Sequence, residues 1–165
     1  MRILNEFKLY FKEYFSEVIS IFFICVVIQF THEFTNRNLL VVLFGAINKD
    51  IMQYVKLCVL STYLVSFVKM ALKEKREHNL WSALLFKIIT IILLVTTLIS
   101  SYKILIGYEL LWLNILIFYI SISISQFVEY IIIKSSKISK EIEEIIKYVN
   151  LLSIIIFWII TLWLA

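Results

Sequence analysis

Long apolar runs separated by clusters of polar residues are the dominant pattern of this 165-residue chain. A run of about 20 apolar residues is long enough for a helix to cross a bilayer. The pattern predicts one all-α integral membrane domain over residues 1–165, a bundle of five transmembrane helices. The predicted spans are residues 14–30, 51–72, 80–102, 108–133 and 146–165.

Two amphipathic segments are expected to lead into spans. Before the first span, an apolar stripe runs from Phe7 to Val18 at helical spacing, while Glu6, Glu13 and Glu17 share another face. This segment is typical of an interfacial helix that continues into the membrane. Residues 134–150, KSSKISKEIEEIIKYVN, carry Lys and Glu four residues apart and form a second such helix. Its start is interpreted either as solvated on the membrane surface or as a docking helix for a partner.

The distribution of basic residues predicts the orientation. One set of connecting segments carries eleven Lys and Arg residues, among them Lys69 at the end of the second span, whereas the other set carries Arg37, Lys49 and Lys103. Lys56 and Lys87 fall within spans. Because cytoplasmic segments are enriched in Lys and Arg, we expect a cytoplasmic N-terminus and an external C-terminus.

The composition supports a membrane protein. Hydrophobic residues make up 62% of the chain and charged residues 17%, and the mean hydropathy is +0.94. The net charge of +4 is attributed to basic loops beside anionic lipid, so no nucleic-acid partner is expected. Cys25 and Cys58 fall inside spans without the spacing of a zinc or redox motif, and they are interpreted as packing residues. No metal and no cofactor is expected.

The apolar run at residues 38–48 is too short to cross a bilayer. We expect a re-entrant or interfacial segment on the external side, between the first two spans. For Lys56 three interpretations remain: a side chain that reaches the outer headgroups, an ion pair with Asp50, Glu33 or Glu109, and a ligand site. The polar residues around the run are candidates for a ligand site or a structural clamp: Gln29, His32, Glu33, Asn48, Asp50, Gln53 and Lys56.

The fourth span carries a second polar set, a candidate intramembrane polar face. Its members fall within a sector of roughly 80° at helical spacing, so this face is expected to point into the bundle. Phe118 interrupts it near mid-span. Close helix packing and a hydrated pathway are the two interpretations, and Lys87 is a candidate ion-pair partner for Glu129. The members are Asn114, Ser121, Ser125 and Glu129.

Residues 29–57 also carry a sequence signature. The signature consists of four parts in order: His-Phe-x-Tyr-Glu-Trp-Ser, an Asn, LVxLFxPVN, and Glu-Ser-x-Trp-Glu-His-x-Lys-Leu. This chain matches it in register with LVVLFGAIN at residues 40–48 and with Glu33, Asn38 and Lys56. The chain thus resembles a family of small polytopic membrane proteins from Gram-positive bacteria, catalogued as a domain of unknown function. The resemblance implies a fold and a topology, but no activity.

Departures from that pattern remove most of its titratable groups. This chain has Gln29, Lys49, Gln53 and Tyr54 where the family pattern has His, Glu, Glu and His. Any metal binding or proton transfer by relatives through those groups would therefore be lost here. The segment is accordingly interpreted as a structural or recognition element.

No catalytic constellation is visible. The two histidines, His32 and His78, fall on opposite sides of the predicted membrane, and no pair of carboxylates lies in mid-span. We expect a non-catalytic accessory, immunity-type or partner-binding protein of a bacterial cell membrane. Its expected partners are the lipid bilayer and either another membrane protein or a second copy of the chain. The alternative is a small transporter or permeation unit with an external polar mouth and a polar face on the fourth span.

Overall fold

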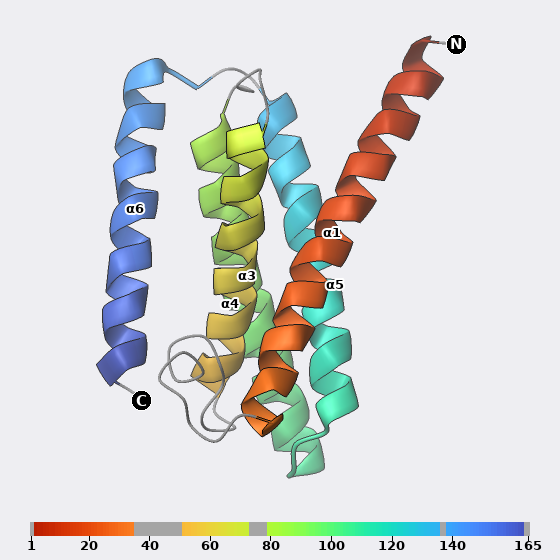
Figure 1. The fold of residues 1–165 in the computed structure, drawn as a ribbon, viewed down its shortest axis with the longest axis vertical. Coiled ribbons are helices and arrows are strands. Elements are labelled where there is room, and N and C mark those ends of the chain that lie inside the picture. Colours follow the sequence, from red (N-terminus) through yellow and green to blue (C-terminus); the bar gives the residue numbers. More distant parts are fainter. Residues whose placement is uncertain (1, 35–50, 73–78, 136–137, 164–165) are drawn as a thin grey trace.

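The chain is all-helical in the part that the computed structural model describes, residues 2–34, 51–72, 79–135 and 138–163. The predicted all-α class is therefore confirmed for these residues (Figure 1). The expected re-entrant or interfacial segment at residues 38–48 lies outside the described residues. The helices are α1 (Arg2–Phe34), α3 (Ile51–Leu72), α4 (Leu80–Ile106), α5 (Leu111–Lys134) and α6 (Lys140–Trp163).

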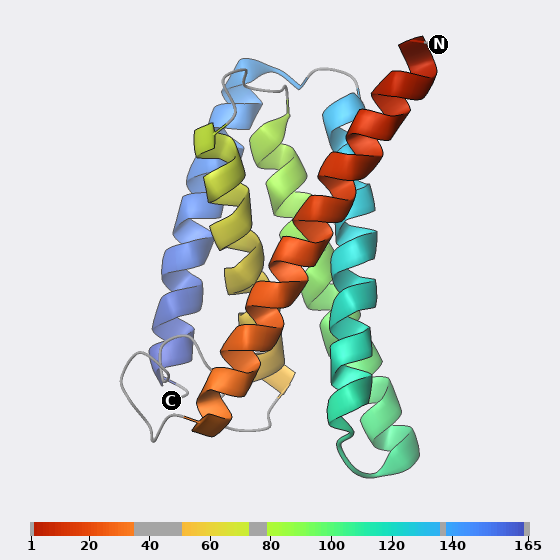
Figure 2. The same cartoon turned by 45° about the vertical axis from the view of Figure 1, so that its right-hand side comes forward.

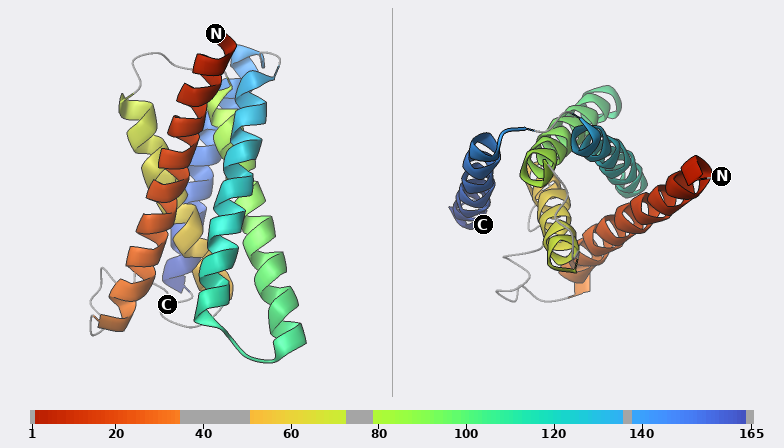
Figure 3. Two further views of the ribbon diagram at one scale, coloured as in Figure 1. Left: turned by 90° about the vertical axis from the view of Figure 1, so that its right-hand side faces the viewer. Right: turned by 90° about the horizontal axis from the view of Figure 1, so that it is seen from above.

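Four of the helices form an up-and-down bundle, and the fifth packs on its outside. The α4 helix packs against both α3 and α5, and α1 packs against the same two helices from the other side. The α6 helix lies along α4, away from α1 and α5 (Figure 3). The first turns of α1 project beyond the bundle and diverge from it (Figure 2). We call the end where α1 begins the N-terminal end; α4 and α6 begin there, and α3 and α5 finish there.

Three described helices are long and apolar enough to cross a membrane by length and composition: α3, α4 and α5. The bounds of α3 coincide with those of the predicted second span, residues 51–72. The α4 helix continues beyond residue 102, where its span was predicted to end, because its terminating residue is Gly107. Gly107 has a φ of 83° and donates its N–H to the Lys103 carbonyl at 2.9 Å. Glycine enters this left-handed conformation without the steric cost that a Cβ imposes.

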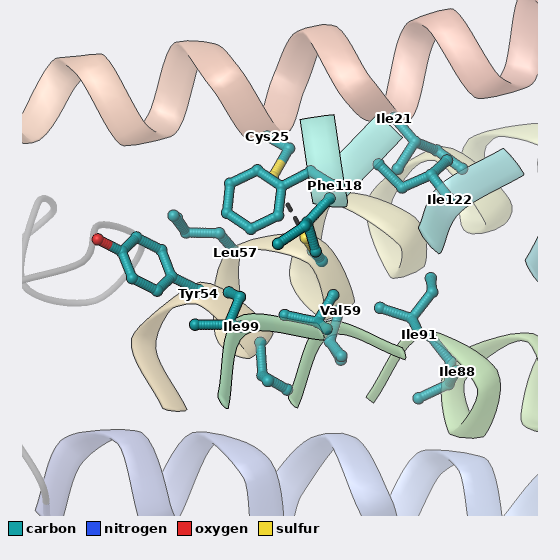
Figure 4. Close-up of a cluster of buried hydrophobic side chains, with 14 of the residues drawn as sticks. Ile21, Cys25, Tyr54, Leu57, Val59, Ile88, Ile91, Ile99, Phe118 and Ile122 are labelled. Atoms are coloured by element: carbon teal, nitrogen blue, oxygen red, sulfur yellow. Dashed lines mark hydrogen bonds between the residues drawn. The ribbon is translucent and has the colours of Figure 1, made fainter. Parts of the chain in front are cut away.

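An apolar core fills the middle of the bundle. On α4, Ile91, Val95 and Ile99 are fully buried and lie between the buried polar residues Lys87 and Tyr102. Their neighbours from the other helices include aromatic, aliphatic and cysteine side chains (Figure 4). This apolar interval of α4 separates Lys87 from Tyr102, while Ser61 and Thr62 of α3 and Ser121 of α5 are buried near the middle of their helices.

Candidate functional site

Four charged side chains, one from each helix of the bundle and three of them buried, meet towards its N-terminal end. Glu17 of α1 and Glu129 of α5 each contact Lys69 of α3 and Lys87 of α4. Lys87 Nζ lies 2.7 Å from both carboxylates, and Lys69 Nζ lies 2.5 Å from Glu17 and 3.1 Å from Glu129. We call this arrangement the charge ring.

Every carboxylate oxygen of the charge ring accepts a bond from a lysine. Glu17 binds Lys87 through Oε1 and Lys69 through Oε2, whereas Glu129 binds Lys69 through Oε1 and Lys87 through Oε2. Each charge therefore has two neighbours of opposite sign, and the four formal charges sum to zero. This alternation offsets the cost of removing the charges from water, a cost that a lone buried ion could not recover.

Burial differs around the ring. The Lys87 side chain has no exposed surface, and the two glutamate side chains are 6% exposed, whereas Lys69 is 20% exposed. Lys69 lies in the last turn of α3, so it is the member nearest to the end of the bundle. Lys87 therefore contributes the charge that depends most on its partners.

Sequence reasoning found half of this ring. The predicted ion pair between Lys87 and Glu129 is present in the structure. The sequence predicts Glu17 on a polar face of the lead-in helix, and it groups Lys69 with the basic residues of the following segment. The sequence does hold a signal that Glu17 faces inward, because Glu17 shares a helix face with the apolar residues Ile21 and Cys25. All three side chains are buried in the structure.

The predicted polar face of α5 does point into the bundle. Asn114, Ser121, Ser125 and Glu129 are all buried, and so is Phe118 between them. The Ser125 hydroxyl donates to a carbonyl of its own helix at 2.8 Å. Within the described part of the chain, Asn114 Nδ2 and Ser121 Oγ have no hydrogen-bond partner. The face is thus a set of separate polar positions, interrupted by an aromatic ring as predicted.

A second polar group lies towards the opposite end, where α4 is joined to α5. The Tyr54 hydroxyl of α3 donates to Glu109 at 3.0 Å, and Glu109 also pairs with Lys103. The Tyr102 hydroxyl donates to the Asn114 carbonyl oxygen. We call these five residues the tyrosine cluster. It joins α3, α4 and α5, and the apolar core separates it from the charge ring.

The polar set predicted around residues 38–48 is only partly described. The side chains of Gln29, His32 and Glu33 lie outside the described part of the structure, as do Asn48 and Asp50. The remaining two members, on α3, are Gln53, which is buried, and Lys56, which has no exposed surface. The interpretation in which the Lys56 side chain reaches the outer headgroups is therefore wrong, because this side chain is enclosed by the protein. The ligand site or clamp stays a prediction.

The start of α6 contacts α4 through Glu143 and Asn150. The Glu143 carboxylate accepts the Trp81 N–H at 2.6 Å and the Ser82 N–H at 3.3 Å, and it also binds the Ser82 hydroxyl. These donors belong to the first turn of α4, where helix N–H groups lack intrahelical partners and a negative charge is favoured. Asn150 of α6 donates to the Trp81 carbonyl at 3.0 Å. Glu143 and Asn150 thus join α6 to the start of α4, whereas Glu141 and Glu144 on either side of Glu143 are exposed, as the predicted solvated helix start requires.

A family model described as "Family of unknown function (DUF6512)" matches residues 3–164. No curated protein and no solved structure matches the chain.

Proposed function

The chain belongs to this family of unknown function, and from that premise we propose that it is a non-catalytic membrane module that binds another membrane component. In this proposal all five helices cross the cell membrane of a bacterium, with the N-terminus in the cytoplasm and the C-terminus outside. The charge ring then lies in the cytoplasmic half and the tyrosine cluster in the external half.

The completeness of the charge ring carries the proposal. A site for a substrate or an ion needs polar groups that are free to bind it, whereas the four carboxylate oxygens of the ring are all used by Lys69 and Lys87. An internally neutral ring holds four helices in one arrangement without any ligand. This geometry fits a scaffold whose work is done by its outer surface.

The apolar core supports the same assignment. A permeation pathway along α5 would have to pass Phe118, which is fully buried. On α4, Ile91, Val95 and Ile99 occupy the corresponding interval between the two polar groups. A hydrated solute would lose its water at this layer without gaining polar contacts from Phe118 or from these three side chains of α4.

The proposed crossing of α1 and α6 rests on their apolar surfaces and their length. Along α6, Ile145, Leu152 and Ile159 are each more than half exposed. Phe23 of α1 is exposed to a similar extent. Side chains of this kind are favourable against lipid and costly in water. The excess of Lys and Arg at the N-terminal end supports placing that end in the cytoplasm.

The surface of α6 is the proposed contact for the partner, because this helix packs mainly on α4 and leaves most of its length uncovered. Photo-activatable side chains at Ile145, Leu152 and Ile159, activated in native membranes, test this. A protein adduct of one constant mass at one or more of these positions, absent at the matched α4 position Leu93, supports the proposal. Lipid adducts at all four positions would contradict it.

Transport by a small permeation unit is the second candidate function. The observation in its favour is that buried polar groups occur near both ends of the bundle and that Asn114 Nδ2 and Ser121 Oγ are left without described partners. Ion and amino-acid flux into proteoliposomes of the purified chain decides between the two. We expect the flux into these proteoliposomes to be no higher than the flux into protein-free vesicles. Flux that is abolished by Glu129→Gln or Lys56→Met would instead establish transport.

A further inference from the structure

Cys25 of α1 and Cys58 of α3 form a buried pair that the charge ring and the tyrosine cluster do not involve. Their sulfur atoms lie 3.6 Å apart, both side chains are fully buried, and neither is in a disulfide (Figure 4). Sequence spacing could not indicate this pair, because the two cysteines are 33 positions apart on different helices. The packing of α1 on α3 brings them together.

The geometry of the two thiols is close to that of a cross-link. A disulfide needs its sulfur atoms about 2.05 Å apart, so the present separation of 3.6 Å has to shorten by about 1.5 Å. Small rotations of both side chains can supply that approach, since the sulfur atoms already face each other. Oxidation of the two thiols can therefore join Cys25 and Cys58 in a disulfide.

The surroundings of the pair select the oxidant. Leu57 and Phe118 are buried in the same cluster (Figure 4), and an apolar environment disfavours the thiolate that attacks water-soluble disulfides. On either side of Cys25 in the sequence, Phe23 and Val27 are exposed apolar residues on the outer surface of α1. An oxidant can reach these buried thiols only if α1 separates from α3, and for a chain in a membrane, as we propose, an oxidant dissolved in lipid would then be nearest to them.

We propose that Cys25 and Cys58 are a two-electron redox site that a lipid-soluble quinone oxidises to a disulfide. The two S–H bonds break and one S–S bond forms. Both electrons and both protons pass to the quinone, which leaves as the quinol. The product fixes α1 covalently to α3 in the middle of the bundle.

The cross-link bears on the charge ring through α1. Glu17 and Cys25 share a face of this helix, two turns apart, and Glu17 contacts Lys69 of α3. A disulfide at Cys25 therefore keeps α1 at the position in which Glu17 reaches its two lysines. In the oxidised protein the disulfide holds Glu17 close to Lys69 and Lys87. In the reduced protein only non-covalent contacts hold α1 in this position.

The test uses the purified full chain, reduced, in lipid vesicles. A short-chain ubiquinone analogue is added to one sample and oxidised glutathione to another, and free thiols are then labelled with a maleimide after unfolding. With the quinone we expect an intact mass lower by two hydrogens, no maleimide label, and one quinol per chain. With oxidised glutathione we expect two labels per chain.

The single variants Cys25→Ser and Cys58→Ser are the controls, and each should keep one labelled thiol after quinone treatment and produce no quinol. The oxidised wild-type chain should also unfold at a higher temperature than the reduced chain, a difference that both variants lack. Two labels on the quinone-treated wild type, a mass increase by quinone addition, or equal oxidation by glutathione disulfide would overturn the proposal.

Discussion

Lys87 is the position at which the charge ring makes its sharpest prediction. Replacing it with Met removes the ammonium group that lies 2.7 Å from both Glu17 and Glu129. Met is of similar length and apolar, so the volume is approximately kept. Two carboxylates that are each 6% exposed then share only Lys69, and the buried group carries a net charge of −1.

The expected loss of stability depends on whether one partner of a buried ion pair is replaced or both are. Leaving one partner of a buried pair uncompensated costs about 3–5 kcal/mol. The double variant Lys87→Met/Glu129→Gln leaves the neutral pair Glu17–Lys69, whose 2.5 Å contact is intact, and should cost about 2 kcal/mol or less. The second substitution should therefore restore at least about 1–3 kcal/mol, which is a strongly non-additive result.

Reversible unfolding of the purified chain in mixed detergent micelles measures these differences, with the fluorescence of its four tryptophans as the signal. The matched control is Lys103→Met. Lys103 pairs with Glu109 but is 25% exposed, so its loss should cost less than about 1 kcal/mol. A Lys87→Met protein as stable as the Lys103→Met protein would refute a structural role for the ring. So would a double variant whose cost equals the sum of the two single variants.

Three further predictions follow from the fold. Glu143→Ala should loosen α6 from α4 by about 1–2 kcal/mol, because buried N–H donors of α4 lose their acceptor; faster amide hydrogen exchange in α6, absent in Glu144→Ala, is the measurement. Phe118→Ala should destabilise the bundle by about 3–5 kcal/mol in the same unfolding assay, because it leaves a cavity in the core. Gly107→Ala should cost about 1 kcal/mol, since a Cβ there meets nothing within 4 Å and only the left-handed φ opposes it; a larger loss would point to a contact that the structure lacks.

The features that sequence predicted are those that depend on one helix at a time. The length of the apolar runs predicted five helical spans, and the structure has a helix at each of them. The bounds of α3 are those predicted, residues 51–72. Helical spacing gave the inward face of α5, on which Asn114, Ser121 and Glu129 are buried. Both inferences use periodicities of 3.6 residues and a bilayer length, which are local properties of the chain.

The features that sequence missed depend on how helices pack. Lys69 lies three residues before the end of α3, so its position along the chain alone places it with the basic residues of the following segment. Glu143 is spaced for an i,i+4 pair with Lys147, and only the docking of α6 on α4 gives its carboxylate the N–H groups of another helix. In both cases the partner is about 50 or more residues away, and no local pattern identifies it.

The order of charges along the chain indicates how the charge ring can form if α1, α3, α4 and α5 all enter a membrane, as we propose. A charge at the centre of a spanning helix costs about 2.5–3.5 kcal/mol on insertion. The α1 and α3 helices bring Glu17 and Lys69, and α4 and α5 bring Lys87 and Glu129, so each successive pair of helices contributes one negative and one positive charge to the ring. Each pair can therefore close its own ion pair before the two pairs meet. The contacts of Glu17 with Lys87 and of Glu129 with Lys69 then join them, which favours this packing over one in which like charges face each other.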